Sequence, residues 1–365
     1  MKTFAAACVV MAATLLPSSL MSPFPRSPIS PFPQSEIPAG TLLVCVQDEA
    51  KIAMVDMASR AVVKTIDLQA MGLPATAKPH YIVVEPDRQH WYVSLIGANT
   101  VAKFNAAGEI VGRFSMETPG MLALSGDRQL VVTRSMSAVN PPKRVAIIDR
   151  TTMEGSEVDV IFPRPHPLAV AGGFAYTGSL GTNQIASVDL KTERVALVNV
   201  PGATHAFVQF AISPDGKTMV GSTEVSGQLM VFDLSSPARP ALVKELPLGK
   251  MVFDPSFTSN GESIWVPVKM DNEVAVVDTK TWTVSRRISS DSFMQPHQVI
   301  FSADGKTAFI TNNNKMDHMA DPAHAGHNMP GMDGPGALSV IDVASGKTLT
   351  SLPLGKNLTG MGVAR

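Results

Sequence analysis

The chain has 365 residues, of which 45% are hydrophobic and 17% are charged, so it is large enough and apolar enough to bury a sizeable core. Its 30 basic residues are balanced by 31 acidic ones, which gives a formal net charge of -1 at pH 7. This balance shows no electrostatic footprint for nucleic acid or an anionic membrane, so polyanion binding is excluded as the main function.

The N-terminus has the features of an export signal. One lysine is followed by an apolar run from Phe4 to Leu16, which is typical of a secretory signal peptide and short for a bilayer span. We assign residues 1–22 to the signal peptide and expect a periplasmic protein whose mature chain has no transmembrane span. The proline-rich residues 23–39 predict an extended linker.

From residue 40 to residue 365, short β-branched runs alternate with turn residues at a period of about forty to forty-five residues, as expected of four-stranded propeller blades. Six such units are visible in this stretch. They begin at Pro79, Pro119, Pro165, His205, Met251 and Pro296.

The two ends of this region complete a seventh unit. The fragment "LTGMGVAR", residues 358–365, has the pattern of a first strand, and "GTLLVCVQDEAKIAMVDMASRAVVKTIDL", which begins at Gly40, supplies the second, third and fourth strands. Joining them closes the ring and removes its free sheet edges. The sequence therefore predicts an all-β fold, a single seven-bladed β-propeller in which the C-terminal strand joins the N-terminal strands.

Several of these segments resemble the YVTN-type β-propeller repeat family over roughly residues 41–365. The resemblance is carried by "SPDGKT" at Ser213, "SADGKTAFITNNN" at Ser302 and the passage "VAVVDTKTWTV". It implies the fold but not one function, because such propellers include surface proteins, periplasmic binding proteins and relatives of the haem-binding propeller of periplasmic nitrite reductases.

Four of the eight histidines are expected to surround the mouth of the central channel. In a propeller blade the innermost strand begins at one face, here called the upper face. Alignment of the units places a common position at this entry, occupied by His80, Gly120, His166, His297 and Gly360. His205 falls three residues earlier in its own unit, near the same rim. The alternative is that Pro-His is a turn preference and that these imidazoles only bind water.

A methionine- and histidine-rich insertion, residues 315–336, lies between a second and a third strand and therefore also on the upper face. Thioether and imidazole ligands suit Cu(I), and with more imidazole Cu(II), whereas zinc usually takes cysteine, histidine and carboxylate and is the weaker candidate. The segment resembles the Met/His-rich segments of bacterial copper-resistance and copper-trafficking proteins. Its candidate ligands are Met316, His318, Met319, His324, His327, Met329 and Met332.

These observations lead to three hypotheses. The first is a monomeric, exported metal-binding propeller that serves copper binding, trafficking or resistance with a periplasmic copper transporter or cuproprotein as partner. The second is a propeller enzyme of the lactonase or lyase type, or a haem-handling propeller, in which Asp254, Glu224 and Asp271 supply oxygen atoms. The third is a protein-interaction scaffold. Because no known catalytic motif is present, no catalytic residue is assigned.

Overall fold

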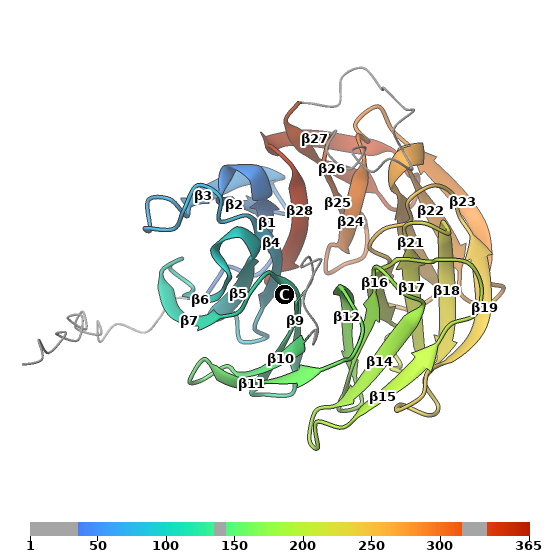
Figure 1. Ribbon diagram of the computed structural model, residues 1–365. Helices are drawn as coiled ribbons and strands as arrows, with labels where there is room; N and C mark the ends of the chain where they lie inside the picture. The colour runs from blue at the N-terminus through green and yellow to red at the C-terminus, as the bar shows by residue number, and fades with distance from the viewer. Residues whose placement is uncertain (1–35, 135–143, 316–333) are drawn as a thin grey trace, which may run out of the picture. The chain divides into compact units, whose positions relative to one another are not determined.

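The computed structural model describes residues 36–134, 144–315 and 334–365, which form seven four-stranded antiparallel sheets (Figure 1). The predicted all-β, seven-bladed propeller is confirmed. The signal peptide, most of the linker and residues 316–333 of the insertion lie outside the described residues. Within the described ranges, no helix has the length and apolar character needed to span a membrane.

Each blade is one sheet, and its strands are given from the innermost to the outermost. Blade 1 contains β28 (Leu358–Val363), β1 (Thr41–Val46), β2 (Lys51–Asp56) and β3 (Ala61–Asp67). Blade 2 contains β4 (Pro79–Val84), β5 (His90–Leu95), β6 (Thr100–Asn105) and β7 (Ile110–Ser115). Blade 3 contains β8 (Pro119–Ser125), β9 (Gln129–Arg134), β10 (Arg144–Asp149) and β11 (Glu154–Asp159). Blade 4 contains β12 (Pro165–Ala171), β13 (Phe174–Ser179), β14 (Gln184–Asp189) and β15 (Val195–Asn199).

The remaining three blades follow the same order. Blade 5 contains β16 (Phe207–Ile212), β17 (Thr218–Thr223), β18 (Gln228–Asp233) and β19 (Ala241–Pro247). Blade 6 contains β20 (Ser256–Phe257), β21 (Ser263–Val268), β22 (Glu273–Asp278) and β23 (Thr283–Ser289). Blade 7 contains β24 (Pro296–Phe301), β25 (Thr307–Asn312), β26 (Gly336–Asp342) and β27 (Thr348–Gly355).

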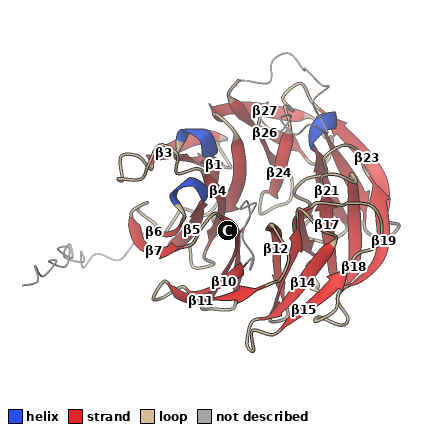
Figure 2. Cartoon of the chain, in the orientation of Figure 1, coloured by secondary structure: helices blue, strands red, loops and turns tan. Residues whose placement is uncertain are grey.

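Helical structure in the described residues is limited to short 3₁₀ turns, drawn blue in Figure 2. They are η1 (Gln47–Glu49), η2 (Ile96–Ala98) and η3 (Lys269–Asp271). Each connects the second strand of a blade to the third, so all three lie on the upper face.

The ring closes as the sequence predicts. Strand β28 pairs antiparallel with β1, with Leu42 opposite Val363 and Val46 opposite Leu358. The innermost strands of successive blades contact one another around the ring, including β28 with β4 and β24 with β28. The first and last strands of the propeller therefore belong to one blade.

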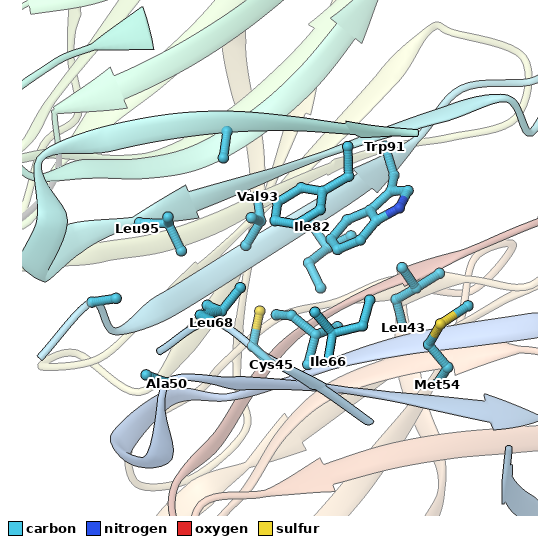
Figure 3. Close-up of a cluster of buried hydrophobic side chains, with 14 of the residues drawn as sticks. Leu43, Cys45, Ala50, Met54, Ile66, Leu68, Ile82, Trp91, Val93 and Leu95 are labelled. Atoms are coloured by element: carbon cyan, nitrogen blue, oxygen red, sulfur yellow. The ribbon is translucent and has the colours of Figure 1, made fainter. Parts of the chain in front are cut away.

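The position of a strand in its blade explains its sequence pattern. A third strand such as β22, "EVAVVD", has four consecutive buried residues because neighbouring blades cover both of its faces. An outermost strand such as β23, "TVSRRIS", alternates between exposed and less exposed residues along most of its length. Figure 3 shows part of the core between blades 1 and 2, where Cys45 packs among Ile66, Leu68 and Ile82.

The entry to each innermost strand has a common backbone geometry. The residue before it has a positive φ of 45–60° in six blades: Lys78, Thr118, Arg164, Ala206, Gln295 and Asn357. In blade 6 the equivalent residue is Met251, with a φ of 59°, which precedes the bridge between Val252 and Val268. In six blades the strand pairing then shifts register. We number channel positions from the residue after this left-handed one, so that Pro79 occupies the first, His80 the second and Tyr81 the third.

Candidate functional site

The second channel positions form what we call the upper ring: His80, Gly120, His166, Val208, Phe253, His297 and Thr359. The predicted equivalence of His80, His166 and His297 is confirmed. The expected match at Gly360 is wrong by one residue, because Leu358 pairs with Val46 as Pro79 pairs with Leu95. Thr359 therefore occupies the second position in blade 1.

The upper-ring histidines are buried, each with 9% of its surface exposed. The His80 and His166 ring centroids are 5.8 Å apart. His80 Nδ1 lies 2.9 Å from Gln47 Oε1, and His166 Nδ1 donates to the Val208 carbonyl at 2.6 Å. Burial lowers the pKa of His80 to about 3 and that of His166 to about 4, so both rings are neutral at physiological pH. Nε2 of His80 is buried and has no hydrogen-bond partner in the described part of the chain.

His205 has a different role from the one predicted at the rim. Its Nε2 lies 2.8 Å from the Pro201 carbonyl and its Nδ1 lies 3.0 Å from Ser226 Oγ. Its backbone N–H donates to Asn183 Oδ1. Both ring nitrogens therefore make hydrogen bonds that hold the loop leading into β16 in place.

The other predicted ligands fall on the insertion. Met316, His318, Met319, His324, His327, Met329 and Met332 lie outside the described residues.

Lys269, the first residue of η3, is fully buried at the upper end of the channel. Its Nζ lies 4.4 Å from the Phe253 ring centroid, and the Phe253 ring centroid is 5.1 Å from that of His297. Nζ has no hydrogen-bond partner among the residues described. Burial lowers the pKa of Lys269 to about 7, although the nearby charges of Glu224 and Asp254 oppose this change.

Below the upper ring, four polar side chains at the third channel position form what we call the central layer: Tyr81, Gln209, Asp254 and Gln298. The Tyr81 hydroxyl accepts hydrogen bonds from Gln209 Nε2 at 3.3 Å and from Gln298 Nε2 at 3.2 Å. Backbone N–H groups hold both amide oxygens, with Leu168 donating to Gln209 and Met361 to Gln298. Tyr81 of blade 2 therefore reaches across the channel to blades 5 and 7.

Asp254 completes the central layer from blade 6 and is only 3% exposed. Neither of its carboxyl oxygens has a hydrogen-bond partner within the described residues. Burial raises the pKa of Asp254 to about 8, and the charge of Lys269 opposes this rise. Burial, and then the charge of Asp254, also raise the pKa of Tyr81. An unsatisfied buried carboxyl with a raised pKa is a typical mark of a functional site.

A cavity of about 550 Å³ extends from the central layer toward the lower face. The four central-layer residues line its inner end, and exposed Pro86 and Arg365 belong to its outer end. The partly exposed apolar residues that line the cavity between these ends are Val83, Val84, Leu124, Ala211, Ile300 and Val363. This combination of apolar walls and a few converging polar groups is that of a small-molecule site.

The cavity lies in the lower half of the channel, whereas the sequence placed the site at the upper mouth. Asp254 was predicted only as an alternative oxygen donor, and Tyr81, Gln209, Gln298 and Lys269 were not predicted as site residues. A signal for Tyr81, Gln209 and Gln298 was present in the sequence. Each follows the aligned histidine position by one residue, and the residue at this next position differs from blade to blade.

Comparisons with known proteins support the fold only. No family model and no curated sequence matches the chain. The periplasmic gluconolactonase of Pseudomonas aeruginosa aligns with a TM-score of 0.66 and 20% identity over 87% of this chain and 98% of that chain. A Bacteroides fragilis protein assigned as a 6-phosphogluconolactonase has a TM-score of 0.65 and 10% identity over 88% and 97%. Dihydro-heme d1 dehydrogenase has a TM-score of 0.59 and 14% identity over 93% and 78%.

These findings correct the leading hypothesis of a copper-handling propeller. In the described ranges, no three His, Cys, Asp or Glu side chains lie close enough together to hold a metal ion. The physical reason is that His205 uses both ring nitrogens in hydrogen bonds within the fold, and that His80 and His166 lie together without a third such side chain close enough among the described residues. The similar structures quoted above are named as lactonases and a haem d1 dehydrogenase, and none of those three names refers to copper.

Proposed function

We propose that this protein is a hydrolase that opens a lactone ring in the channel cavity. The observation that carries the proposal is Asp254, whose two buried carboxyl oxygens lack partners among the described residues at the inner end of the cavity. The names of two structures with the same fold supply the reaction class. A carboxyl group with a pKa of about 8 is a stronger proton acceptor than an ordinary aspartate.

The reaction requires one proton to move twice. Water attacks the lactone carbonyl carbon while the Asp254 carboxylate takes a proton from that water. When the bond between the acyl carbon and the ring oxygen breaks, the same proton passes from Asp254 to the ring oxygen. Lactone and water thus give one hydroxy acid, and the carboxylate is restored for the next cycle.

The two glutamines suit the charge that develops during the attack. Each amide nitrogen carries two N–H groups, of which one is directed to the Tyr81 hydroxyl. The second N–H of Gln209 and of Gln298 can donate to the oxyanion of the tetrahedral intermediate. Because backbone N–H groups hold both amide oxygens, these donors are oriented before the substrate arrives.

The test is hydrolysis of δ-valerolactone by the full chain, followed by titration of the acid that is released. We expect kcat/KM to rise with pH through about 8, as Asp254 ionises. Asp254→Asn should lower kcat/KM by roughly 10²–10⁴-fold, the usual contribution of a general base. Asp278→Asn makes the same chemical change in an outer turn and should keep the activity. Equal activity of the Asp254→Asn variant and the wild type would overturn the proposal.

A haem-handling propeller is a second candidate, favoured by the unpartnered Nε2 of neutral His80. It has less support, because His80, His166 and His297 are each only 9% exposed and a planar macrocycle needs an open face. Titration with haemin tests it. A shifted absorption band that disappears in His80→Ala would favour this candidate, and an unchanged spectrum would eliminate it.

We also propose that the chain is exported and belongs with the YVTN-type repeats. Residues 1–22 have the charge and apolar run of a signal peptide, and the turns and third strands have the pattern of that repeat family. Mass spectrometry of the protein purified from a bacterial periplasm tests export. A mature chain that begins after the apolar run is expected, and a chain that retains Met1 would contradict it.

A further inference from the structure

The cavity is polar at its ends and apolar between them. Its inner end carries the central layer, and Glu85 and Arg365 are polar residues at the lower end. Ser256, midway between them, donates its hydroxyl to the Val299 carbonyl. The walls are the six partly exposed apolar residues named above, which come from blades 1, 2, 3, 5 and 7. A ligand that fills the cavity is therefore recognised by hydrogen bonds at one end and by apolar contacts along its length.

This distribution of polar groups disfavours a sugar lactone. Glucono-δ-lactone carries hydroxyl groups around its ring, and these would lose hydrogen bonds to water against walls such as Val83, Leu124 and Ile300. A hydrocarbon substituent in the same place gains from leaving water.

From this asymmetry we infer that the substrate is a lactone with an alkyl substituent, bound with its ring at the central layer and its chain along the walls toward the lower face. The inference rests on the proposed lactone hydrolysis and names its substrate class. The path is limited in length, because Tyr81 and Glu85 are separated by four residues of an extended strand, about 13 Å at ~3.3 Å per residue.

The experiment measures kcat/KM for δ-lactones of increasing alkyl length, from δ-valerolactone through δ-octalactone to δ-dodecalactone, with glucono-δ-lactone alongside. Each methylene that contacts the walls should raise kcat/KM by about fourfold, which is ~0.8 kcal/mol per buried CH₂ converted to a ratio. The increase should stop when the chain reaches the lower rim. Glucono-δ-lactone should be the poorest substrate of the series.

Two wall variants and one control locate the effect in the cavity. Leu124→Asn and Val363→Asn replace apolar wall residues with polar ones, and both should reduce the gain per methylene. Val63→Asn makes a similar change on β3, where Val63 is 59% exposed, and should leave the chain-length dependence as in the wild type. A dependence that is equal in all three variants would place the alkyl chain outside this cavity.

A parallel binding measurement separates the inference from the proposed reaction. Alkyl δ-lactams, which resist hydrolysis, are titrated into the wild type by calorimetry. Lactone hydrolysis without chain-length dependence would overturn the substrate class and leave the reaction standing. No hydrolysis, with lactam affinity that rises with chain length, would overturn the reaction and leave the ligand class standing. The absence of both would overturn both.

Discussion

The residue that caps the lower-face turn is nearly the same in every blade, whereas the residue at the third channel position differs from blade to blade. The third strand ends with aspartate in six blades: Asp56, Asp149, Asp189, Asp233, Asp278 and Asp342. Blade 2 has Asn105 there. In every blade this side chain accepts a hydrogen bond from a backbone N–H of the following turn. The third channel positions have little in common by contrast: Tyr81, Met121, Pro167, Gln209, Asp254, Gln298 and Gly360.

This difference separates what the fold requires from what it leaves free. The same kind of side chain recurs at this turn in all seven blades because it caps the turn between the third and fourth strands, and the geometry of that turn requires the cap. At the third channel position the strand entry repeats its geometry while the side chain changes. The fold therefore makes no common demand there, and the residue is free to serve a ligand.

Two aspartates show the contrast in one residue type. Backbone and side-chain hydrogen bonds from Thr281 lower the pKa of Asp278 at the solvent-facing turn. Burial raises the pKa of Asp254 to about 8 in the channel. One carboxylate is held in its charged form by its partners, and the other is poised to exchange a proton near neutral pH.

Among the variants below, which compare channel residues with turn residues, we expect the largest effect from the substitution of Tyr81. Tyr81→Phe removes the acceptor that orients Gln209 and Gln298, so kcat/KM should fall by about 10–100-fold. The free energy of unfolding should fall by about 1–3 kcal/mol, because two buried amides lose a partner. The matched control is Tyr176→Phe, since the buried Tyr176 hydroxyl has no partner in the described chain. Lactone assays and urea unfolding measure both quantities, and equal effects of the two variants would contradict the assigned role of Tyr81.

Lys269→Met should stabilise the protein by about 2 kcal/mol at pH 7, because it removes a buried amine without a described partner. It should also raise the pKa of Asp254, since the lysine charge lowers that pKa. The rise of kcat/KM with pH should therefore move to higher pH. Lys280→Met is the control, because its side chain is 76% exposed in the turn between β22 and β23, the two outer strands of blade 6. An unchanged pH profile in Lys269→Met would show that Lys269 does not act on Asp254.

The pH dependence of stability should reveal both buried groups. The folded protein holds more protons than the unfolded chain between pH 3.8 and about 8 because of Asp254, so stability falls as pH rises through that range. For Lys269 the unfolded chain holds more protons between about 7 and 10.5, so its contribution to stability rises with pH there. The contributions of Asp254 and Lys269 together predict a minimum in the free energy of unfolding between about pH 7 and 8. Urea unfolding of the wild type and of an Asp254→Asn, Lys269→Met double variant measures it, and the minimum should be shallower in the double variant.

Much of the fold could be predicted from the sequence because it repeats. The period, the Asp-Gly turns and the complementary fragments at Gly40 and Leu358 were sufficient for seven blades and for their closure. The shared position of His80, His166 and His297 was also readable. Each of these signals is local and recurs, so a single chain supplies its own comparison.

The site depended on contacts that no local pattern contains. Tyr81 meets Gln209 and Gln298 across 128 and 217 residues of chain, and only ring closure brings them together. The one-residue error at Gly360 arose because the register shift at the strand entry is invisible in sequence. The role of His205 depends on Ser226 and Pro201 in neighbouring loops, and the raised pKa of Asp254 depends on burial by other blades.

The smallest effect is expected at a turn of the lower face. Asp278→Ala removes one of seven equivalent caps, so it should lower the melting temperature slightly and leave kcat/KM unchanged. The pKa of Asp278 is lowered in the folded protein, so its contribution to stability is present above the unfolded value of 3.8 and is lost as pH falls through the folded value. The difference in melting temperature between the variant and the wild type should therefore shrink in acid. A loss of activity in Asp278→Ala at neutral pH would mean that the turns and the channel are not independent, and the contrast between them would fail.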